Sequence, residues 1–139
     1  MSTLVLTVRE ALRYKGREGQ LAWVGHRLAG LGTLLFFVIH IADTALVTFK
    51  PDWYAVAIDI YKLPLFQVGE MLLMLAVIYH GVNGLRIILM DSIPSLWKKQ
   101  REMTLGAFAL TALLYLPALY IMAGDALKEL YNVHLPGVG

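Results

Sequence analysis

The residues with the clearest potential for chemistry stand near the end of a long apolar run, at positions 78–91. His80 lies within the run, Gly81 and Gly84 follow it, and Arg86 stands where polar sequence returns. An ionisable side chain at membrane depth is rare and indicates a function by default. Imidazole ligates haem iron, glycine admits a bulky group beside a helix, and arginine pairs with a propionate. These residues favour a haem site to the same extent as a second interpretation, in which His80 hydrogen-bonds a neighbouring helix and the glycines allow close packing.

The composition of the chain is that of a membrane protein. Of its 139 residues, 58% are hydrophobic and 16% are charged, and the mean hydropathy is +0.64. Soluble domains contain about 45–50% apolar and about 25% charged residues. The length favours one domain, residues 1–139, and we expect an all-α integral membrane fold. The chain has no cysteine, which excludes a disulfide, a thiolate metal site and an iron–sulfur cluster of its own.

Three apolar segments are long enough to cross a bilayer, which takes about twenty residues. We expect these transmembrane helices at residues 21–47, 65–90 and 103–122. Residues 49–64 mix Trp and Tyr with charged residues, as is typical of a helix at the membrane surface. Pro94 ends the second segment because proline cannot continue a helix. The sequence thus predicts three transmembrane helices with a short interfacial helix between the first and the second.

The polar ends of the chain give its expected orientation. Residues 1–20 form a polar arm, which is interpreted as a membrane-surface helix, a partner-binding helix or a loosely ordered terminus. The arm lacks the features of a signal peptide, so the first span is expected to act as its own insertion signal. Basic residues concentrate on the side of the arm, which the positive-inside rule places in the cytoplasm. Residues 21–122 then form the membrane region and residues 123–139 an outer-side tail.

Helical rise predicts the depth of the polar side chains within the spans. At ~1.5 Å per residue, His80 lies ~15 Å from the inner end of its span. His26, Arg27 and Arg86 are expected nearer the inner surface. A haem on His80 would direct its propionates toward these three side chains. Because the chain offers one His at the depth of His80, a second axial His would have to come from another chain.

Two further features of the spans leave alternatives open. On the first span His26, Gly30 and His40 share one face, which we expect to contact protein because polar groups in hydrocarbon need partners. His40 is either the ligand of a second haem near the outer face or a structural residue hydrogen-bonded across helices, for example to Glu70. Asp43 and Glu70 lie at similar depth, as a proton path, as a carboxyl pair that shares a proton, or as carboxylates in the wet interfacial zone.

Two motifs, in order, resemble those of the cytochrome b556 subunit of succinate dehydrogenase, a membrane anchor of respiratory complex II. The first is a His-Arg pair followed by Gly. The second is His, three residues, Gly, an aliphatic residue, Arg, and an Asp five residues further on. In this chain they read His26, Arg27, Gly30, and then His80, Gly84, Leu85, Arg86, Asp91. Segments 40–47 and 61–64 look like the branch found in actinobacteria and related bacteria, and the resemblance covers roughly residues 20–120.

The resemblance implies a role for each matched residue. His80 corresponds to an axial ligand of haem b, whose second ligand comes from the other anchor subunit. His26 corresponds to a residue near the haem propionates, Arg27 to one near the quinone, and Arg86 to a propionate or surface partner. The chain departs from the family pattern at the quinone site. Trp23 stands where many members have a quinone-binding Ser, so Trp23 is expected to pack against the quinone ring.

The predicted function is that of a haem b-binding membrane anchor of succinate:quinone oxidoreductase. It would share in the quinone site, with menaquinone or ubiquinone as substrate, and would do no succinate chemistry itself. Expected partners are the flavoprotein, iron–sulfur and second anchor subunits, in the lipid bilayer of a bacterial cytoplasmic membrane; no nucleic acid is expected. The competing interpretation is a haem-free structural anchor of a quinone-linked dehydrogenase or fumarate reductase, in which His80 serves packing only.

Overall fold

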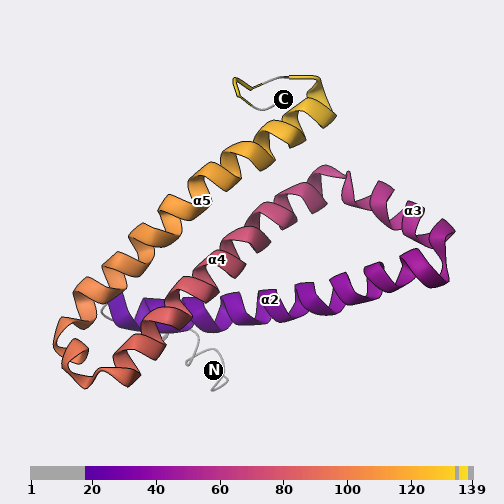
Figure 1. Ribbon diagram of the computed structural model, residues 1–139. Coiled ribbons are helices and arrows are strands. Elements are labelled where there is room, and N and C mark those ends of the chain that lie inside the picture. Colours follow the sequence, from indigo (N-terminus) through magenta and orange to yellow (C-terminus); the bar gives the residue numbers. More distant parts are fainter. Residues whose placement is uncertain (1–17, 134, 138–139) are drawn as a thin grey trace, which may run out of the picture.

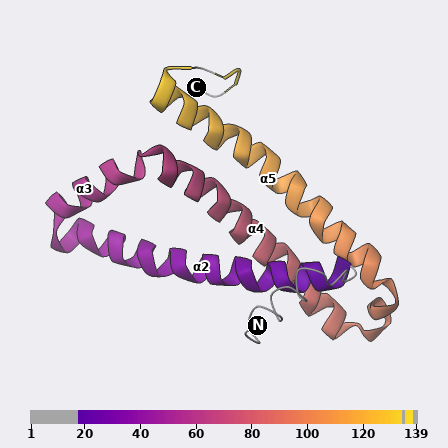
Figure 2. The ribbon, with the colours of Figure 1, turned by 180° about the vertical axis from the view of Figure 1, so that it is seen from behind.

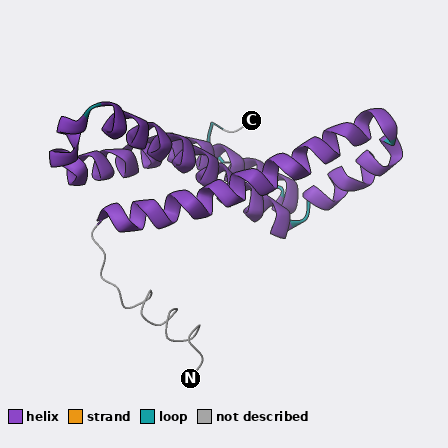
Figure 3. Ribbon diagram, turned by 90° about the horizontal axis from the view of Figure 1, so that it is seen from below, coloured by secondary structure: helices purple, strands orange, loops and turns teal. Residues whose placement is uncertain are grey.

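The described part of the chain consists of long helices. The computed structural model describes residues 18–133 and 135–137, and within them it contains no strand. The elements are α2 (Glu18–Phe49), α3 (Pro51–Tyr61), α4 (Pro64–Ser92), the 3-10 helix η1 (Pro94–Lys99) and α5 (Gln100–Tyr131). Figure 3 shows that only short loops separate them. Most of the predicted arm, residues 1–17, lies outside the described residues.

Three helical segments are long and apolar enough to cross a membrane. They are Glu18–Phe49, Pro64–Ser92 and Pro94–Tyr131. The short helix α3 stands between the first and the second of them. The predicted all-α, multi-pass membrane fold is therefore confirmed.

The helices meet at one end of the molecule and diverge at the other. Helix α4 packs against both α2 and α5. Figures 1 and 2 show that α2 and α4 cross near the start of α2 and separate toward α3, which bridges their far ends. We call the end with η1, where α2 and α5 begin, the η1 end, and the opposite end the α3 end. Side chains of the three spans α2, α4 and α5 can meet only toward the η1 end, so a site that all three share would lie there.

Prolines stand at the starts of three of the elements. Helices α3 and α4 and the 3-10 helix η1 each have Pro in their first positions. A proline is well suited there because its missing N–H has no intrahelical partner in any case and its φ is already helical. Pro94 also disfavours helical geometry in the preceding residue, so α4 ends at Ser92, two residues beyond the predicted end of the second span and just before the predicted break.

Helix α5 is longer than the sequence predicted. The third span was expected to end at residue 122 and an outer tail to follow, whereas the helix continues to Tyr131. The side chain of Gln67 on α4 donates a hydrogen bond of 3.0 Å to Glu129, which fastens these last turns to α4. Asn132 then closes the helix in the left-handed conformation, with φ 55°, and its N–H bonds carbonyls of the last turn. The segment is amphipathic, so the apolar run that identifies a span ended before the helix did.

Small and polar residues fill the space between the helices. The buried apolar side chains include Ala22, Ala29 and Ala107, whereas Leu28 and Leu31 on α2 are each 65% exposed. Lipid chains are as apolar as leucine, so helices in a membrane associate by close backbone approach at small residues. Large apolar side chains can then face outward without cost. Because small apolar residues offer no side-chain hydrogen bonds, the buried polar side chains have few possible hydrogen-bond partners.

Candidate functional site

Two histidines from different helices stack face to face toward the η1 end. The rings of His26 on α2 and His80 on α4 are parallel to within 4°, with centroids 4.2 Å apart. The prediction that the chain has a single His at the depth of His80 is therefore wrong. It rested on counting residues from the end of each span, which takes no account of the angle at which α2 and α4 cross.

The hydrogen bond of His80 fixes the state of its imidazole. His80 Nδ1 lies 3.2 Å from the backbone carbonyl oxygen of His26. A carbonyl can only accept, so Nδ1 carries the proton and, in the neutral ring, Nε2 keeps a free lone pair. Nε2 makes no hydrogen bond with any described residue. Metal-ligating histidines characteristically donate their other N–H to a carbonyl or carboxylate in this way.

Two of the predicted pocket glycines give space to these rings. A Cβ at Gly30 would lie 2.9 Å from Cε1 of His80, which is closer than real Cβ contacts come. A Cβ at Gly84 would lie 3.5 Å from Cε1 of His26, an ordinary contact. A Cβ at Gly81 would meet nothing within 4 Å. Gly30 is therefore required for the approach of His80 to α2, while Gly84 is merely well suited.

The guanidinium of Arg86 is buried instead of marking the return to water. Arg86 is 8% exposed and donates from a terminal nitrogen to the hydroxyl of Thr104 on α5. Thr104 donates in turn to the carbonyl of Gln100, at 2.8 Å. The Nε of Arg86 is buried without a hydrogen-bond partner, as is Nδ1 of His26. The site thus contains two inward-facing polar atoms that no described group satisfies.

Sequence reasoning missed two polar residues next to this site. The Tyr79 hydroxyl donates to the carbonyl of Ala22 at 2.8 Å, and its ring stacks on Phe108 with centroids 5.8 Å apart. Asn83 is 0% exposed, its amide nitrogen lies 3.5 Å from the same carbonyl, and its Oδ1 has no partner. Tyr79, Asn83 and Arg86 follow one another at helical spacing, so a search for polar residues on one face of the second span would have found them.

The two predicted quinone residues lie together on the surface of α2. The guanidinium carbon of Arg27 is 4.1 Å from the ring centroid of Trp23, in a cation–π arrangement. Both side chains are exposed, and Trp23 retains 47% of its accessible surface. One face of the indole is thus covered by a cation, and the pair remains open to a ligand or a partner.

The family of the chain follows from comparison with known proteins. The model of the family described as succinate dehydrogenase/fumarate reductase transmembrane subunit matches residues 7–118. The chain belongs to this family. It is 34% identical over 96 residues to the succinate dehydrogenase 2 membrane subunit SdhC of Mycobacterium tuberculosis. This match covers 66% of this chain and 71% of the relative. It is 36% identical over 101 residues to the succinate dehydrogenase hydrophobic membrane anchor subunit of Archaeoglobus fulgidus, covering 72% and 81%.

The prediction of a succinate dehydrogenase membrane anchor, rather than the subunit that oxidises succinate, is thereby confirmed. Within residues 18–133 and 135–137, the anchor has no group of three or more His, Asp or Glu side chains arranged to hold a bare metal ion.

The outer half of the predicted histidine face does not pack against the anchor itself. His26 and Gly30 contact His80 and Gly84 of α4, but His40 is exposed because α2 diverges from α4 toward the α3 end. The ring of His40 stacks on Phe36, with centroids 5.3 Å apart. Its side chain forms no hydrogen bond with a described residue, so the interhelical bond suggested as its structural role is absent.

The carboxylate of Asp43 pairs with a tyrosine and not with Glu70. The hydroxyl of Tyr61, at the end of α3, donates to Oδ2 of Asp43. This hydrogen bond, followed by desolvation, raises the pKa of Tyr61 to about 12. The contact ties α3 to α2, and no hydrogen bond joins the side chains of Asp43 and Glu70 in the structure.

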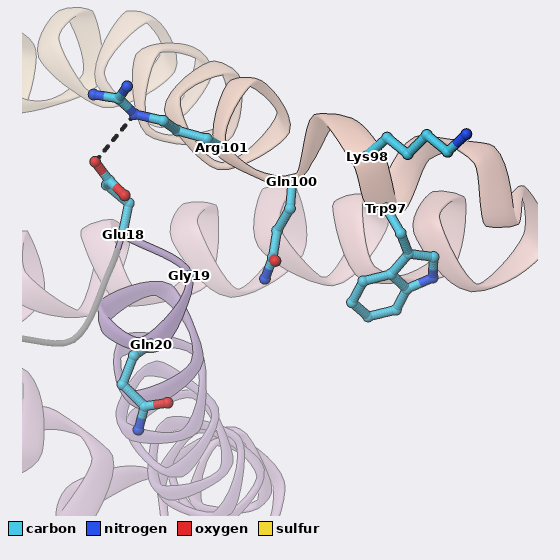
Figure 4. A pocket seen from close by; sticks show the side chains of 7 residues that line it. All are labelled: Glu18, Gly19, Gln20, Trp97, Lys98, Gln100 and Arg101. Carbon is cyan, nitrogen blue, oxygen red and sulfur yellow. Dashed lines mark hydrogen bonds and ion pairs between the residues drawn. The ribbon is translucent and has the colours of Figure 1, made fainter.

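A cleft opens at the η1 end, next to the start of α2. It has a volume of about 730 Å³, and Figure 4 shows the side chains around it. Glu18 and Arg101 form an ion pair across it at 3.2 Å. Its lining residues are Glu18, Gly19, Gln20, Trp97, Lys98, Gln100 and Arg101. None of the predicted site residues is among them, although Trp23 lies one helical turn beyond Gln20.

Proposed function

We propose that this anchor binds haem b and helps to pass electrons from an iron–sulfur partner to quinone in succinate:quinone oxidoreductase. The observation that carries the proposal is the state of His80, whose Nδ1–H is bound by the His26 carbonyl while Nε2 is left free. Nε2 is not among the buried side-chain atoms that lack a partner, so its lone pair is accessible to a ligand from outside the chain, as a haem ligand requires. Haem b held by His80 would supply a one-electron carrier.

The residues around His80 fit a haem in their chemistry. His80 would provide one axial ligand, and a histidine of a second anchor subunit the other. His26 Nδ1 and Arg86 Nε are buried polar atoms without partners, and haem propionates would satisfy such atoms. Arg27 would add charge at the exposed side, and Gly30 and Gly84 keep the imidazoles close to the opposite backbone.

The quinone would lie against Trp23 and Arg27. The uncovered face of the indole offers a flat apolar surface to a quinone ring. The Arg27 guanidinium would stabilise a quinone oxygen as it gains negative charge, which is the kind of interaction that lowers a reaction barrier. Both groups are exposed on this chain, so the remaining walls of the pocket would come from partner subunits.

The proposed setting is a complex with flavoprotein, iron–sulfur and second anchor subunits in a bacterial cytoplasmic membrane. The whole chain would act as one membrane-anchor domain, with its N-terminus in the cytoplasm. The support is the excess of Lys and Arg near the start of α2 and around η1, such as Lys98, Lys99 and Arg101. Either menaquinone or ubiquinone would serve as substrate.

The test is a reduced-minus-oxidised spectrum of the complex purified with this chain, with haem quantified as its pyridine haemochrome. One haem b per copy, lost in His80→Ala and retained in His40→Ala, is the expected result. Two haems per copy, one of them lost in His40→Ala, would make His40 a ligand as well. A native complex without haem would overturn the proposal and leave a haem-free structural anchor.

A further inference from the structure

The interface of α4 and α5 holds a cation, Arg86, that has no counter-ion among the described residues. Arg86 is 8% exposed, and its one hydrogen-bonded side-chain partner is the neutral hydroxyl of Thr104. In the part of the chain that the structure describes, the ion pairs are Lys62 with Asp59 and Arg101 with Glu18, both on the surface. An arginine cannot lose its proton in a protein, so its charge stays in the interior.

This arrangement is costly for folding alone. Burying a charge without a paired carboxylate is strongly unfavourable, and an apolar side chain of similar volume would serve helix packing better. Thr104 is itself 0% exposed and is already satisfied by the carbonyl of Gln100. The contact with Arg86 is therefore dispensable for Thr104, and packing does not explain why a guanidinium occupies this position.

The charge of Arg86 is close to the proposed haem ligand and poorly screened. Six residues of α4 separate it from His80, which corresponds to a rise of ~9 Å along the helix. Arg86 is 8% exposed and Asn83, which stands between the two residues in the sequence, is 0% exposed, so little solvent reaches this part of α4. In such surroundings the effective dielectric constant is about 20 or less, so a unit charge retains a sizeable effect at this range.

We propose that Arg86 raises the reduction potential of the haem bound by His80. This inference rests on the proposed function. Reduction takes one electron from the iron–sulfur partner, and no bond is made or broken in the chain. The added electron lowers the charge of the haem by one unit, so a fixed positive charge nearby favours the reduced form. Arg86 would act through its electric field alone, which makes the haem a better electron acceptor.

The experiment is a redox titration of the haem in the purified complex, followed by its visible spectrum. In Arg86→Met, which removes the charge and keeps much of the volume, the ratio of reduced to oxidised haem at fixed ambient potential is expected to fall about tenfold. For a one-electron couple this is about 59 mV. Arg86→Lys keeps the charge and Thr104→Val removes only the hydroxyl, so both are expected to titrate close to the native complex.

The outcomes separate this inference from the proposed function. Haem present in Arg86→Met with an unchanged potential, or an equal shift in Thr104→Val, would overturn the role of the charge while leaving the haem-binding anchor intact. If Arg86→Met does not assemble, Arg86→Gln provides a neutral side chain that can still bond Thr104. Loss of haem from both neutral variants but not from Arg86→Lys would overturn potential setting in favour of haem retention. A native complex without haem would overturn the proposed function itself.

Discussion

At the scale of single residues, the tightest packing in the site is between Gly30 and the ring of His80. The ring is held on one side by its hydrogen bond to the His26 carbonyl and on its face by the His26 imidazole. It therefore cannot move away freely when a methyl group is added at Gly30. A substitution at Gly30 therefore tests the position of the His80 ring without removing the histidine itself.

Gly30→Ala is expected to displace the His80 ring and to break its 3.2 Å hydrogen bond. The loss costs about 1 kcal/mol, which weakens haem binding about fivefold. Haem content per complex, measured as the haemochrome, checks this. Gly81→Ala is the matched control because its methyl group would meet open space, and it is expected to keep haem and to gain about 0.5–1 kcal/mol of helix stability. Equal haem in both variants would contradict the prediction.

Arg27→Met is expected to lower the turnover of quinone reduction about 100-fold, because a positioned donor to a developing oxyanion contributes about that much. Succinate oxidation with a soluble acceptor, which takes electrons before they reach the membrane, should be unchanged. Lys50→Met is the control, since it removes an exposed cation at the opposite end of α2. If both electron acceptors are affected alike, Arg27 would be needed for assembly and not for quinone.

The residues that sequence reasoning found and missed differ in a physical way. His80, Gly30 and Arg86 were found because an ionisable or very small residue in an apolar run is conspicuous. Tyr79 and Asn83 share a helical spacing with Arg86 that sequence reasoning overlooked, but spacing alone could not have given their common partner, the carbonyl of Ala22 on another helix. The stacking of the two imidazoles depends in the same way on the crossing of α2 and α4.

At the scale of elements, the spans could be predicted well and the ends of helices poorly. Apolar length fixes where a segment crosses a membrane, and prolines fixed the starts of α3 and α4. The end of α5 depends instead on a contact between Gln67 and Glu129, which are 62 residues apart. A hydropathy profile cannot include a contact between residues so far apart in the sequence. The helix therefore extends beyond the end of the apolar run.

The contact of α3 with α2 predicts a distinct response to alkaline pH. The pKa of Tyr61 is raised to about 12 by its bond to Asp43, against an ordinary value of 10.0. Because the folded-state pKa is the higher one, the stabilisation is complete below pH 10 and is lost as the pH rises toward 12. We expect Tyr61→Phe to lower the midpoint of thermal unfolding in detergent at pH 8. The variant should also lack the loss of stability that the native protein shows as the pH rises from 10 toward 12.

Tyr54→Phe is the matched control for Tyr61. Tyr54 lies on the same helix, is only partly exposed, and makes no hydrogen bond through its hydroxyl with a described residue. Its variant should keep both the thermal midpoint and the native alkaline decline. If Tyr61→Phe declined between pH 10 and 12 as the native protein does, Tyr61 would not be the group that titrates.

At the scale of the whole molecule, the two ends of the helix bundle differ in charge. Around the η1 end stand Arg27, Lys98, Lys99 and Arg101, whereas the opposite end carries Lys50, Lys62 and Lys128. The positive-inside rule counts Lys and Arg near the ends of the spans, and carboxylates contribute little to it. The positive-inside rule therefore predicts that the η1 end faces the cytoplasm and the α3 end the opposite side.

The absence of cysteine allows this orientation to be tested directly with single substitutions. Ser95→Cys lies in η1 and Asp52→Cys lies at the start of α3, and both positions are exposed. A membrane-impermeant thiol reagent is expected to label Asp52→Cys in intact spheroplasts and Ser95→Cys only in inverted vesicles. The native chain, without a thiol, measures the background. The reverse pattern would place the quinone residues Trp23 and Arg27 away from the cytoplasm, where a cytoplasmic iron–sulfur partner could not supply their electrons, and would contradict the proposed path.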